Sequence, residues 1–333
     1  MATTRTVINS RRAAGSALLA VLWLSAALSA IAFSLATTVR AEGERASTAV
    51  DEVRTHYLAV GAIQRALLYM QWGRAYAGPE GTSRFYTWGA PFLSFDFPTG
   101  HADVRITPEA AKMNVTATPP EDLYRLLVLL GAEPERAQGI AMAIVQSRSA
   151  LPGDPPTASG EANLSLGPTF QSRRASLEEI EDLLQVRGMT PELFYGSYER
   201  NREGRLVPRA GLKDCLTVYS AGMAYDVNTA QPAVLGAIGL SPEQVALIVE
   251  TRKQAPFRSI QQIVPLVEGT PALGRLRVGG DAIYTLTATA RLRLQNGALS
   301  DERQSVAAMV KFLGGGYDDR CHILRWYDSV WVQ

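Results

Sequence analysis

The sequence predicts an α+β protein in which a long N-terminal helix packs on an antiparallel sheet and a large helical region interrupts that sheet. Three observations lead to this fold class. An unbroken apolar stretch, SALLAVLWLSAALSAIAFSLA, occupies residues 16–36 and continues into a segment with helical spacing. Two blocks of short runs rich in aromatic and β-branched residues lie before residue 116 and near the end of the chain. Helix signals fill the stretch between those blocks.

The apolar stretch is long enough to cross a membrane. At about 1.5 Å of rise per residue, roughly twenty apolar residues in a helix match the roughly 30 Å of bilayer hydrocarbon. A signal peptide has an apolar core of only about 7–15 residues. Because Arg5, Arg11 and Arg12 precede the stretch, the positive-inside rule keeps the N-terminus in the cytoplasm. We therefore expect a single membrane span with the bulk of the chain outside the cytoplasm.

Two interpretations of this N-terminus compete. In one it is a plain signal anchor, or a signal peptide cut near the small residues around Ala41. In the other a leader ends at Gly15, cleavage leaves Ser16 as the new N-terminus, and the apolar helix continues into an amphipathic stalk. The stalk favours the second, because no proline interrupts residues 42–71 and apolar residues recur there at helical spacing. These residues are Val50, Val53, Tyr57, Val60, Ile63, Leu67 and Met70.

The remaining elements follow in order. The first strand block contains RFYTW, FLSFDF and ADVRIT, between residues 84 and 107. The expected helices have helical spacing or an N-cap serine followed by an acid, and they are Pro120–Gly131, Glu135–Arg148, Ser176–Gly188, Thr190–Tyr195, Ala233–Gly239 and Ser241–Lys253. The second strand block comprises Leu276–Val278, Ala282–Arg293, Ser305–Phe312 and His322–Tyr327.

Composition indicates a folded, exported protein that is not an enzyme. The net charge is +1 and the arginines are interspersed with acids, so no strongly charged partner is implied.

Cys215 and Cys321 either join as a disulfide in an oxidising compartment or remain two free thiols. The histidines, His56, His101 and His322, are expected at the surface or in packing, since no Gly-x-Ser-x-Gly, His-Glu-x-x-His, Cys-x-x-Cys or phosphate-loop motif accompanies them.

The N-terminus resembles the type IV pilin superfamily, whose precursors are cut after a glycine. Most such precursors carry glutamate at the fifth mature position, but here that position is Ala20. The stretch GSALLAVLWLSAALSAIAFSLA is similar to the protein K family of minor pseudopilins in the type II secretion system, which lacks this glutamate. Two internal segments are similar as well: Lys112-Met113-Asn114-Val115 before a helix pair, and YDVNTA at residues 225–230 before Pro232.

The resemblance implies a domain order along the chain. Residues 1–15 are a prepilin-type leader, 16–39 a transmembrane helix and 40–75 a periplasmic stalk helix. Residues 76–117 then form the first part of the pseudopilin αβ domain. Residues 118–270 form a helical insertion similar to sterile-α-motif and helix-hairpin-helix units, and residues 271–333 complete the sheet.

The resemblance also implies a role and its partners. The protein is expected to cap the tip of the pseudopilus, initiate its assembly and support export of folded proteins across the outer membrane. Its partners would be the other minor pseudopilins, the major pseudopilin, the prepilin peptidase, and secreted cargo or the outer-membrane channel. It would be anchored in the bacterial inner membrane, with its bulk in the periplasm and no nucleic acid bound.

Members of the protein K family carry an acidic loop suited to calcium, which takes six to eight oxygen ligands. The corresponding stretch here supplies only Asp154 and Glu161, within a Pro/Gly/Ser-rich loop over residues 149–167. We therefore expect calcium to be absent or weakly held, and no other cofactor.

A membrane-anchored DNA-uptake receptor is the alternative function. Residues 183–194 and 238–263 look like helix-hairpin-helix units, whose turns offer backbone N–H groups to phosphate. However, Glu192 and Glu243 lie where phosphate would approach, and the near-neutral chain lacks a basic surface. The sequence therefore favours a protein-interaction role for these hairpins.

Overall fold

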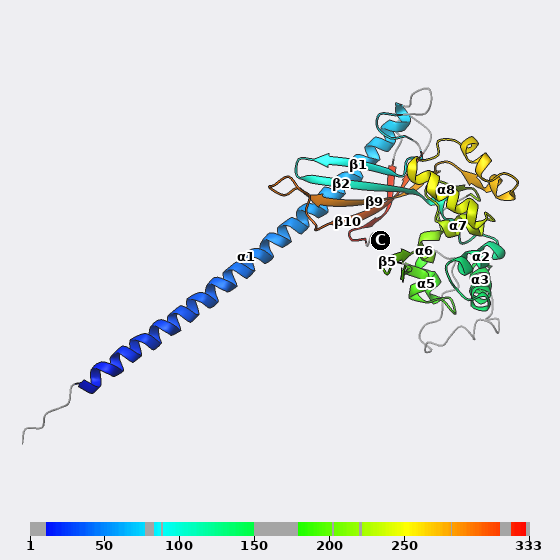
Figure 1. The fold of residues 1–333 in the computed structure, drawn as a ribbon. Coiled ribbons are helices and arrows are strands. Elements are labelled where there is room, and N and C mark those ends of the chain that lie inside the picture. Colours follow the sequence, from blue (N-terminus) through cyan, green and yellow to red (C-terminus); the bar gives the residue numbers. More distant parts are fainter. Residues whose placement is uncertain are drawn as a thin grey trace, which may run out of the picture. The chain divides into compact units, whose positions relative to one another are not determined.

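The computed structural model describes residues 11–76, 83–87, 89–149, 179–201, 203–219, 222–280, 282–313 and 321–330 (Figure 1). These residues fall into two compact units divided between Thr55 and His56. One helix, α1 (Arg11–Ala75), is continuous over 65 residues and contributes to both units. The predicted span and stalk are thus a single helix.

The second unit contains a five-stranded antiparallel sheet. Its strands are β1 (Phe92–Phe97), β2 (Gly100–Pro108), β9 (Ile283–Leu292), β10 (Gln304–Phe312) and β11 (Cys321–Tyr327). They lie in the order β1-β2-β9-β10-β11, each antiparallel to its neighbours. The two predicted strand blocks therefore combine in one sheet, with the elements from η1 to β8 inserted between β2 and β9 (Figure 1).

The end of α1 packs on one face of this sheet. Its buried residues are Leu58, Ala59, Ala62, Ile63, Ala66, Leu67 and Met70, and the sheet residues that share their core include Phe95, Val104, Ile106, Leu286 and Val306. Three alanines lie on this face of the helix, and their small side chains let the backbone of α1 come close to the strands. The hydrophobic core begins at Leu58, so only the later part of the predicted apolar stripe is packed; Val50, Val53 and Tyr57 are exposed.

Two predicted strands are not part of the five-stranded sheet. The run RFYTW does not form a strand in its described residues; instead Tyr86 is buried, and its main chain lies so close to Gly73 of α1 that a Cβ on Gly73 would collide with it. Leu276–Val278 forms β8 (Leu276–Arg277), but β8 pairs with β7 (Tyr225–Asp226) inside the helical insertion. The predicted strand at Leu276–Val278 therefore belongs to this small pair and not to the five-stranded sheet.

The insertion has its own hydrophobic core and consists of two similar parts. The first part contains η1 (Glu109–Ala111), β3 (Met113–Asn114), α2 (Pro120–Leu129), α3 (Pro134–Ser149), η2 (Ile180–Gln185), α5 (Pro191–Tyr195), β4 (Ser197–Arg200), β5 (Leu206–Arg209), α6 (Leu212–Cys215) and β6 (Leu216–Thr217). The second part contains β7, α7 (Pro232–Ala237), α8 (Pro242–Gln254), η3 (Ile260–Gln262), η4 (Val264–Leu266), η5 (Pro271–Arg275) and β8. The predicted helices are present, except that Ser176 lies outside the described residues and residues 180–185 form a 3-10 helix.

The two parts repeat one set of backbone contacts. We call residues 113–217 of the first part, which follow η1, the first repeat, and residues 225–277 the second repeat. In each, a short strand is followed by a turn, a helix hairpin and a second short strand parallel to the first: β3 with β6, and β7 with β8. The amide of Val115 donates to Thr217 (2.9 Å), and the amide of Val227 donates to Arg277 (3.0 Å). The insertion is therefore an internal duplication.

An arginine closes the turn in each repeat. Arg148, in the last turn of α3, donates to the carbonyl oxygens of Val115 (3.1 Å) and Thr118 (2.7 Å). In the second repeat, Arg252 near the end of α8 donates to the carbonyl oxygens of Val227 (2.8 Å) and Ala230 (2.7 Å). Each guanidinium group thus ties the end of the hairpin to the turn that begins the repeat.

Candidate functional site

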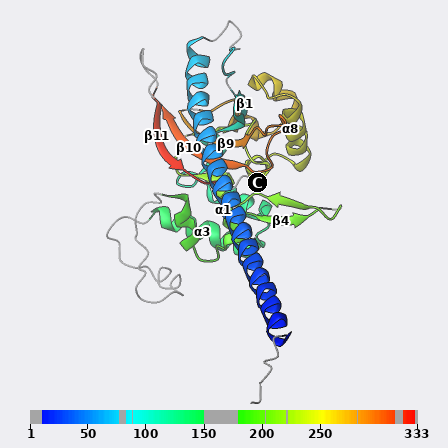
Figure 2. The same ribbon diagram turned by 90° about the vertical axis from the view of Figure 1, so that its left-hand side faces the viewer.

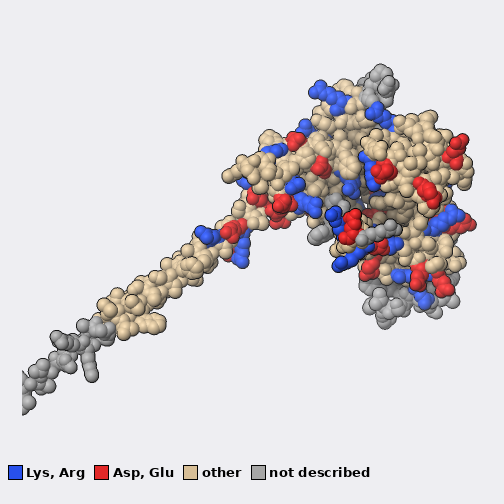
Figure 3. Space-filling model, viewed as in Figure 1, with Lys and Arg blue, Asp and Glu red and all other residues tan. Residues whose placement is uncertain are grey.

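The first candidate site is the apolar part of α1. No charged residue occurs between Ser16 and Val39, and every described side chain from Ala17 to Val50 is exposed. By length and composition this is the one helix among the described residues that could cross a membrane, with a mean hydropathy of 2.2 in its most apolar window. The chain therefore has one apolar N-terminal helix of the kind that serves as a single-pass anchor. Figure 3 shows uncharged surface along this stretch.

The residues predicted for leader cleavage lie at the start of this helix. Gly15 and Ser16 are helical in α1, but their side chains lie outside the described residues, as do residues 1–10 entirely. Ala20, the position of the missing pilin glutamate, is exposed on the helix. The apolar stretch brings no acid of its own before Glu42, so nothing on it would need a countercharge inside a lipid or helix environment.

The helix-hairpin-helix turns form the second candidate site. Gly188 and Gly239 have φ values of +87° and +106°, which glycine adopts without steric cost. Ser241 caps α8 by accepting from the amide of Gln244 (3.2 Å), while the side chain of Gln244 accepts from the amide of Ser241 (3.0 Å). These two amides at the start of α8 are thus already bonded within the protein.

Three cations near these turns are also engaged. Arg136 donates to the carbonyl oxygen of Gly188 (2.6 Å), Arg252 holds the two carbonyls described above, and Lys253 pairs with Glu250 (3.2 Å). A DNA-binding hairpin needs free amides and free cations directed at phosphate. Because these amides and cations are bonded within the protein, the DNA-receptor alternative is not favoured.

The two cysteines are free thiols in this structure. Cys215 is a buried free thiol in α6, within the core of the insertion, and Cys321 is a half-buried free thiol on β11 that packs against the core of the sheet. Burial raises the pKa of the Cys321 thiol to about 11, and it raises the pKa of the Cys215 thiol further. Both side chains therefore act as small apolar residues, the second alternative from the sequence.

The calcium candidates Asp154 and Glu161 lie outside the described residues, so their role stays a prediction. Within the described ranges, no group of three or more His, Cys, Asp or Glu side chains could hold a metal ion.

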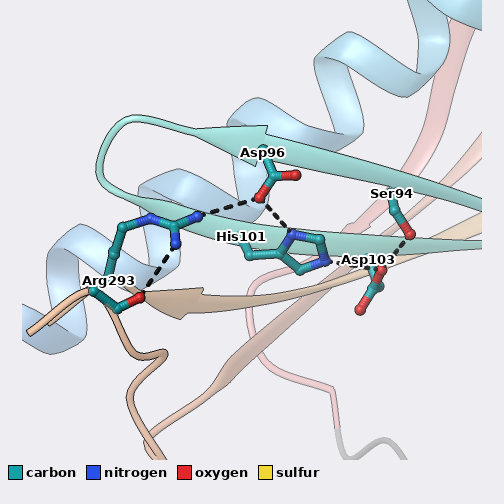
Figure 4. Close-up of polar contacts among 6 residues, drawn as sticks. Ser94, Asp96, His101, Asp103 and Arg293 are labelled. Atoms are coloured by element: carbon teal, nitrogen blue, oxygen red, sulfur yellow. Dashed lines mark hydrogen bonds and ion pairs between the residues drawn. The ribbon is translucent and has the colours of Figure 1, made fainter.

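A polar cluster that the sequence did not predict lies near the β1–β2 turn (Figure 4). The Nδ1 atom of His101 lies 3.0 Å from Asp96 and its Nε2 atom 3.2 Å from Asp103. Arg293 on the segment after β9 also pairs with Asp96 (3.2 Å). Hydrogen bonding to Asp96, opposed by partial burial, raises the pKa of His101. The sequence did carry a signal for this cluster. Positions 94 and 96 in β1 and 101 and 103 in β2 alternate, so their side chains lie on the same face of the strand pair.

This cluster is not arranged for catalysis. The hydroxyl of Ser94 donates to Asp103 and not to His101, and both ring nitrogens of His101 face carboxylates (Figure 4). A serine nucleophile requires its base within hydrogen-bonding reach. The cluster therefore ties β1, β2 and the end of β9 together at the surface.

The interface between the sheet and the first repeat is held by a buried ion pair. The carboxylate of Glu109 accepts from the hydroxyl of Thr217 in β6 (2.5 Å), from that of Thr285 in β9 (2.7 Å) and from Lys112 (3.2 Å). Burial alone would raise the pKa of Glu109, but Lys112 and the two hydroxyl groups outweigh it and hold that pKa below its ordinary value. Glu109 thus joins the sheet to the insertion in its charged form.

Comparisons with known proteins give a likeness in fold. No family model and no curated protein matches the chain. Among solved structures, the chain is similar to one chain of the GspK-GspI-GspJ complex from the type 2 secretion system of enterotoxigenic Escherichia coli. The sequence identity is 15%, the TM-score is 0.49, and the alignment covers 81% of this chain and 98% of that one.

Proposed function

We propose that this protein is a minor pseudopilin of the type II secretion system, similar to the protein K family, that caps the tip of the pseudopilus. The observation that carries the proposal is α1, a single helix of 65 residues that begins apolar and exposed and ends packed on an antiparallel sheet. A helix of this kind can remain in the membrane before assembly and join a bundle of similar helices afterwards.

Ala20 supports a place at the tip. In the pilin superfamily, the glutamate at this position is thought to neutralise the N-terminal amine of the subunit above. A subunit at the top of a filament has no such neighbour, and an unpaired carboxylate in an apolar setting costs several kcal/mol. The absence of any acid between Ser16 and Ala41 therefore suits a subunit that joins first.

The rest of the mechanism is assembly. After the leader is removed at Gly15 by the prepilin peptidase, the span would bundle with the helices of the other minor pseudopilins and the major pseudopilin. Small residues such as Ala17, Ala20, Ser25 and Ala30 allow close helix packing in lipid. The helical insertion would then prevent addition of subunits above it and present a periplasmic surface to cargo or to the outer-membrane channel.

The test is processing in the native host, with secretion measured in the same cells. We expect Gly15→Ala to leave the protein uncut and to abolish secretion, while the level of membrane-bound protein is unchanged. Ala20→Glu, the matched substitution inside the span, should be cut normally and should reduce secretion only mildly. Normal secretion by cells that contain only uncut Gly15→Ala protein would contradict the proposal, as would mature protein that begins beyond residue 39.

A further inference from the structure

The β4–β5 hairpin is an addition to the first repeat. It lies between α5 and α6 and projects from the helices of the insertion (Figure 2). At the corresponding place in the second repeat, η5 ends at Arg275 and β8 begins at Leu276. Because the second repeat makes the same parallel strand pair without a hairpin, the hairpin is not needed to complete the repeat.

The base of the hairpin is fixed by two glycines. Gly196 has a φ of +93°, and a Cβ there would collide with the main chain of residues 209–211. A Cβ on Gly211 would collide in turn with the main chain of Phe194 and Gly196. The side chain of Arg209 packs on Gly131 in the α2–α3 turn and pairs with Glu199. The hairpin therefore leaves the repeat through a tight and well-anchored stem.

The two edges of the hairpin differ. The amide of Asn201 donates to Arg205 (2.9 Å), and hydrogen-bonded pairs alternate with open pairs along an antiparallel ladder. Tyr198 and Pro208, which are register partners, thus belong to an open pair. Proline has no N–H, so it interrupts the outer edge of β5. The outer edge of β4 keeps the N–H and C=O groups of Tyr198 and Arg200, which have no hydrogen-bond partner in the described part of the chain.

The side chains beside this edge are apolar and cationic. Tyr198 and Leu206 are 60% and 64% exposed, and they share one face of the hairpin with Arg200, the register partner of Leu206. Arg200 forms no ion pair with the residues that the structure describes. Residues 197–209 contain four arginines and two glutamates, a local surplus of positive charge in a chain that is otherwise nearly neutral.

We infer that the outer edge of β4 binds an extended acidic segment of a partner protein by adding a strand to the hairpin. The backbone groups of Tyr198 and Arg200 would pair with that segment. Tyr198 and Leu206 would cover its apolar side chains, and the surplus arginines would attract its carboxylates. The inference is independent of the proposed function, because it involves no residue of α1.

The probe is a fluorescent eight-residue peptide of alternating Glu and Val, titrated into the full chain in detergent micelles. We expect saturable binding with a Kd below about 1 mM that weakens as salt is added. A peptide of alternating Lys and Val should bind at least about tenfold more weakly. N-methylation of alternate peptide amides should also abolish binding, because it removes the donors of the added strand while keeping the side chains.

Two sets of variants locate the site. Deletion of residues 197–210, which joins the adjacent glycines Gly196 and Gly211, should abolish binding while leaving the thermal unfolding transition in place. If that deletion prevents folding, the double variant Tyr198→Ser, Leu206→Ser tests the site instead. We expect this double variant to bind the peptide at least about tenfold more weakly. Val207→Ser, on the other face of the hairpin opposite Glu199, is the matched control and should bind normally. Failure of the Glu-Val peptide to bind, or unchanged binding by the paired serine variant, would overturn the inference, whatever the outcome of the Gly15→Ala experiment.

Discussion

The two repeats of the insertion show which contacts the fold needs and which parts it can vary. Both keep the short parallel strand pair, the arginine that closes the turn, and a helix hairpin whose second helix begins with Pro-Glu at residues 134–135 or 242–243. The first repeat is longer. Its α3 ends at Ser149 and its η2 begins at Ile180, whereas α8 of the second repeat ends at Gln254 and η3 begins at Ile260, and the β4–β5 hairpin has no counterpart in the second repeat. Because the second repeat forms the same strand pair and helix hairpin without these additions, the additions are free to carry interactions.

The repeats also differ in how they are joined to the sheet region. The first is joined through the charged carboxylate of Glu109, which bonds Thr285 in β9. The second uses a neutral amide: the side chain of Asn228 donates to the carbonyl oxygens of Gly89 (3.2 Å) and Phe257 (2.9 Å) and accepts from the amide of Phe257 (2.8 Å). The first repeat is thus joined to the sheet region by a charged carboxylate, and the second repeat by an uncharged amide.

The largest expected effect breaks the charged contact. Glu109→Ala leaves Lys112 buried without its partner, and we expect it to lower the free energy of unfolding by about 3–5 kcal/mol. Asn228→Ala removes neutral hydrogen bonds and should cost about 1–3 kcal/mol. Denaturant unfolding of the full chain in detergent, followed by tyrosine and tryptophan fluorescence, measures both. Equal losses in the two variants would contradict the distinction between the contacts.

A smaller effect compares the two arginines. Arg252→Met leaves two carbonyl oxygens unpaired and also removes the cation that lies near the buried carboxylate of Asp226. We expect a loss of about 2–3 kcal/mol. Arg148→Met opens the matching turn, but Arg148 is less buried, and Asn114, the residue that corresponds to Asp226 in the first repeat, is uncharged, so the loss should be about 1 kcal/mol. The reverse order, measured by the same unfolding experiment, would contradict the weight given to burial and to the carboxylate of Asp226.

The smallest effect is a pH dependence of opposite sign in the two repeats. The pKa of Glu109 is lowered in the fold, so its contribution to stability is present above the ordinary carboxyl pKa and is lost as pH falls through the folded value. Burial raises the pKa of Asp226, so its contribution is present below the ordinary pKa and is lost as pH rises through the folded value.

Two isosteric variants separate these signs. Glu109→Gln should lose less stability than the wild type when the pH is lowered. Asp226→Asn introduces the residue type found at Asn114 in the first repeat. Its free energy of unfolding, relative to that of the wild type, should be higher at pH 7 than at pH 4. Unfolding midpoints measured across this range test the pair. A shift of the same sign in both variants would refute the assignment of these two carboxylates.

Much of the fold could be predicted from local patterns. The alternation in FLSFDF and in residues 283–292 predicts β1 and β9, and the Ser241-Pro242 cap predicts α8, because alternation and capping are local patterns in the sequence. The face of α1 was predicted only in part. Ile63, Leu67 and Met70 follow the helical spacing, but the alanines at 59, 62 and 66 pack because the sheet lies against them, and spacing of large residues does not signal this.

Some features of the candidate sites also have a local pattern in the sequence, and others depend on contacts between distant residues. The apolar span is a property of composition and could be read directly, whereas the contact of Glu109 with Thr285 joins residues far apart in the chain and has no local signal. The duplication did have a signal, since Gly-x-x-Pro-Glu occurs at residues 131, 188 and 239. Its significance depends on the arginine contacts and the parallel strand pairs, which only the folded chain brings together.

Pro108 and Tyr284 are register partners at the ends of β2 and β9, so the chain departs from the sheet and comes back to it at one rung. A short turn across this rung would connect β2 directly to β9. The inserted region therefore enters and leaves the sheet at a single pair of neighbouring strand ends, and its length can vary without changing the register of β2 and β9.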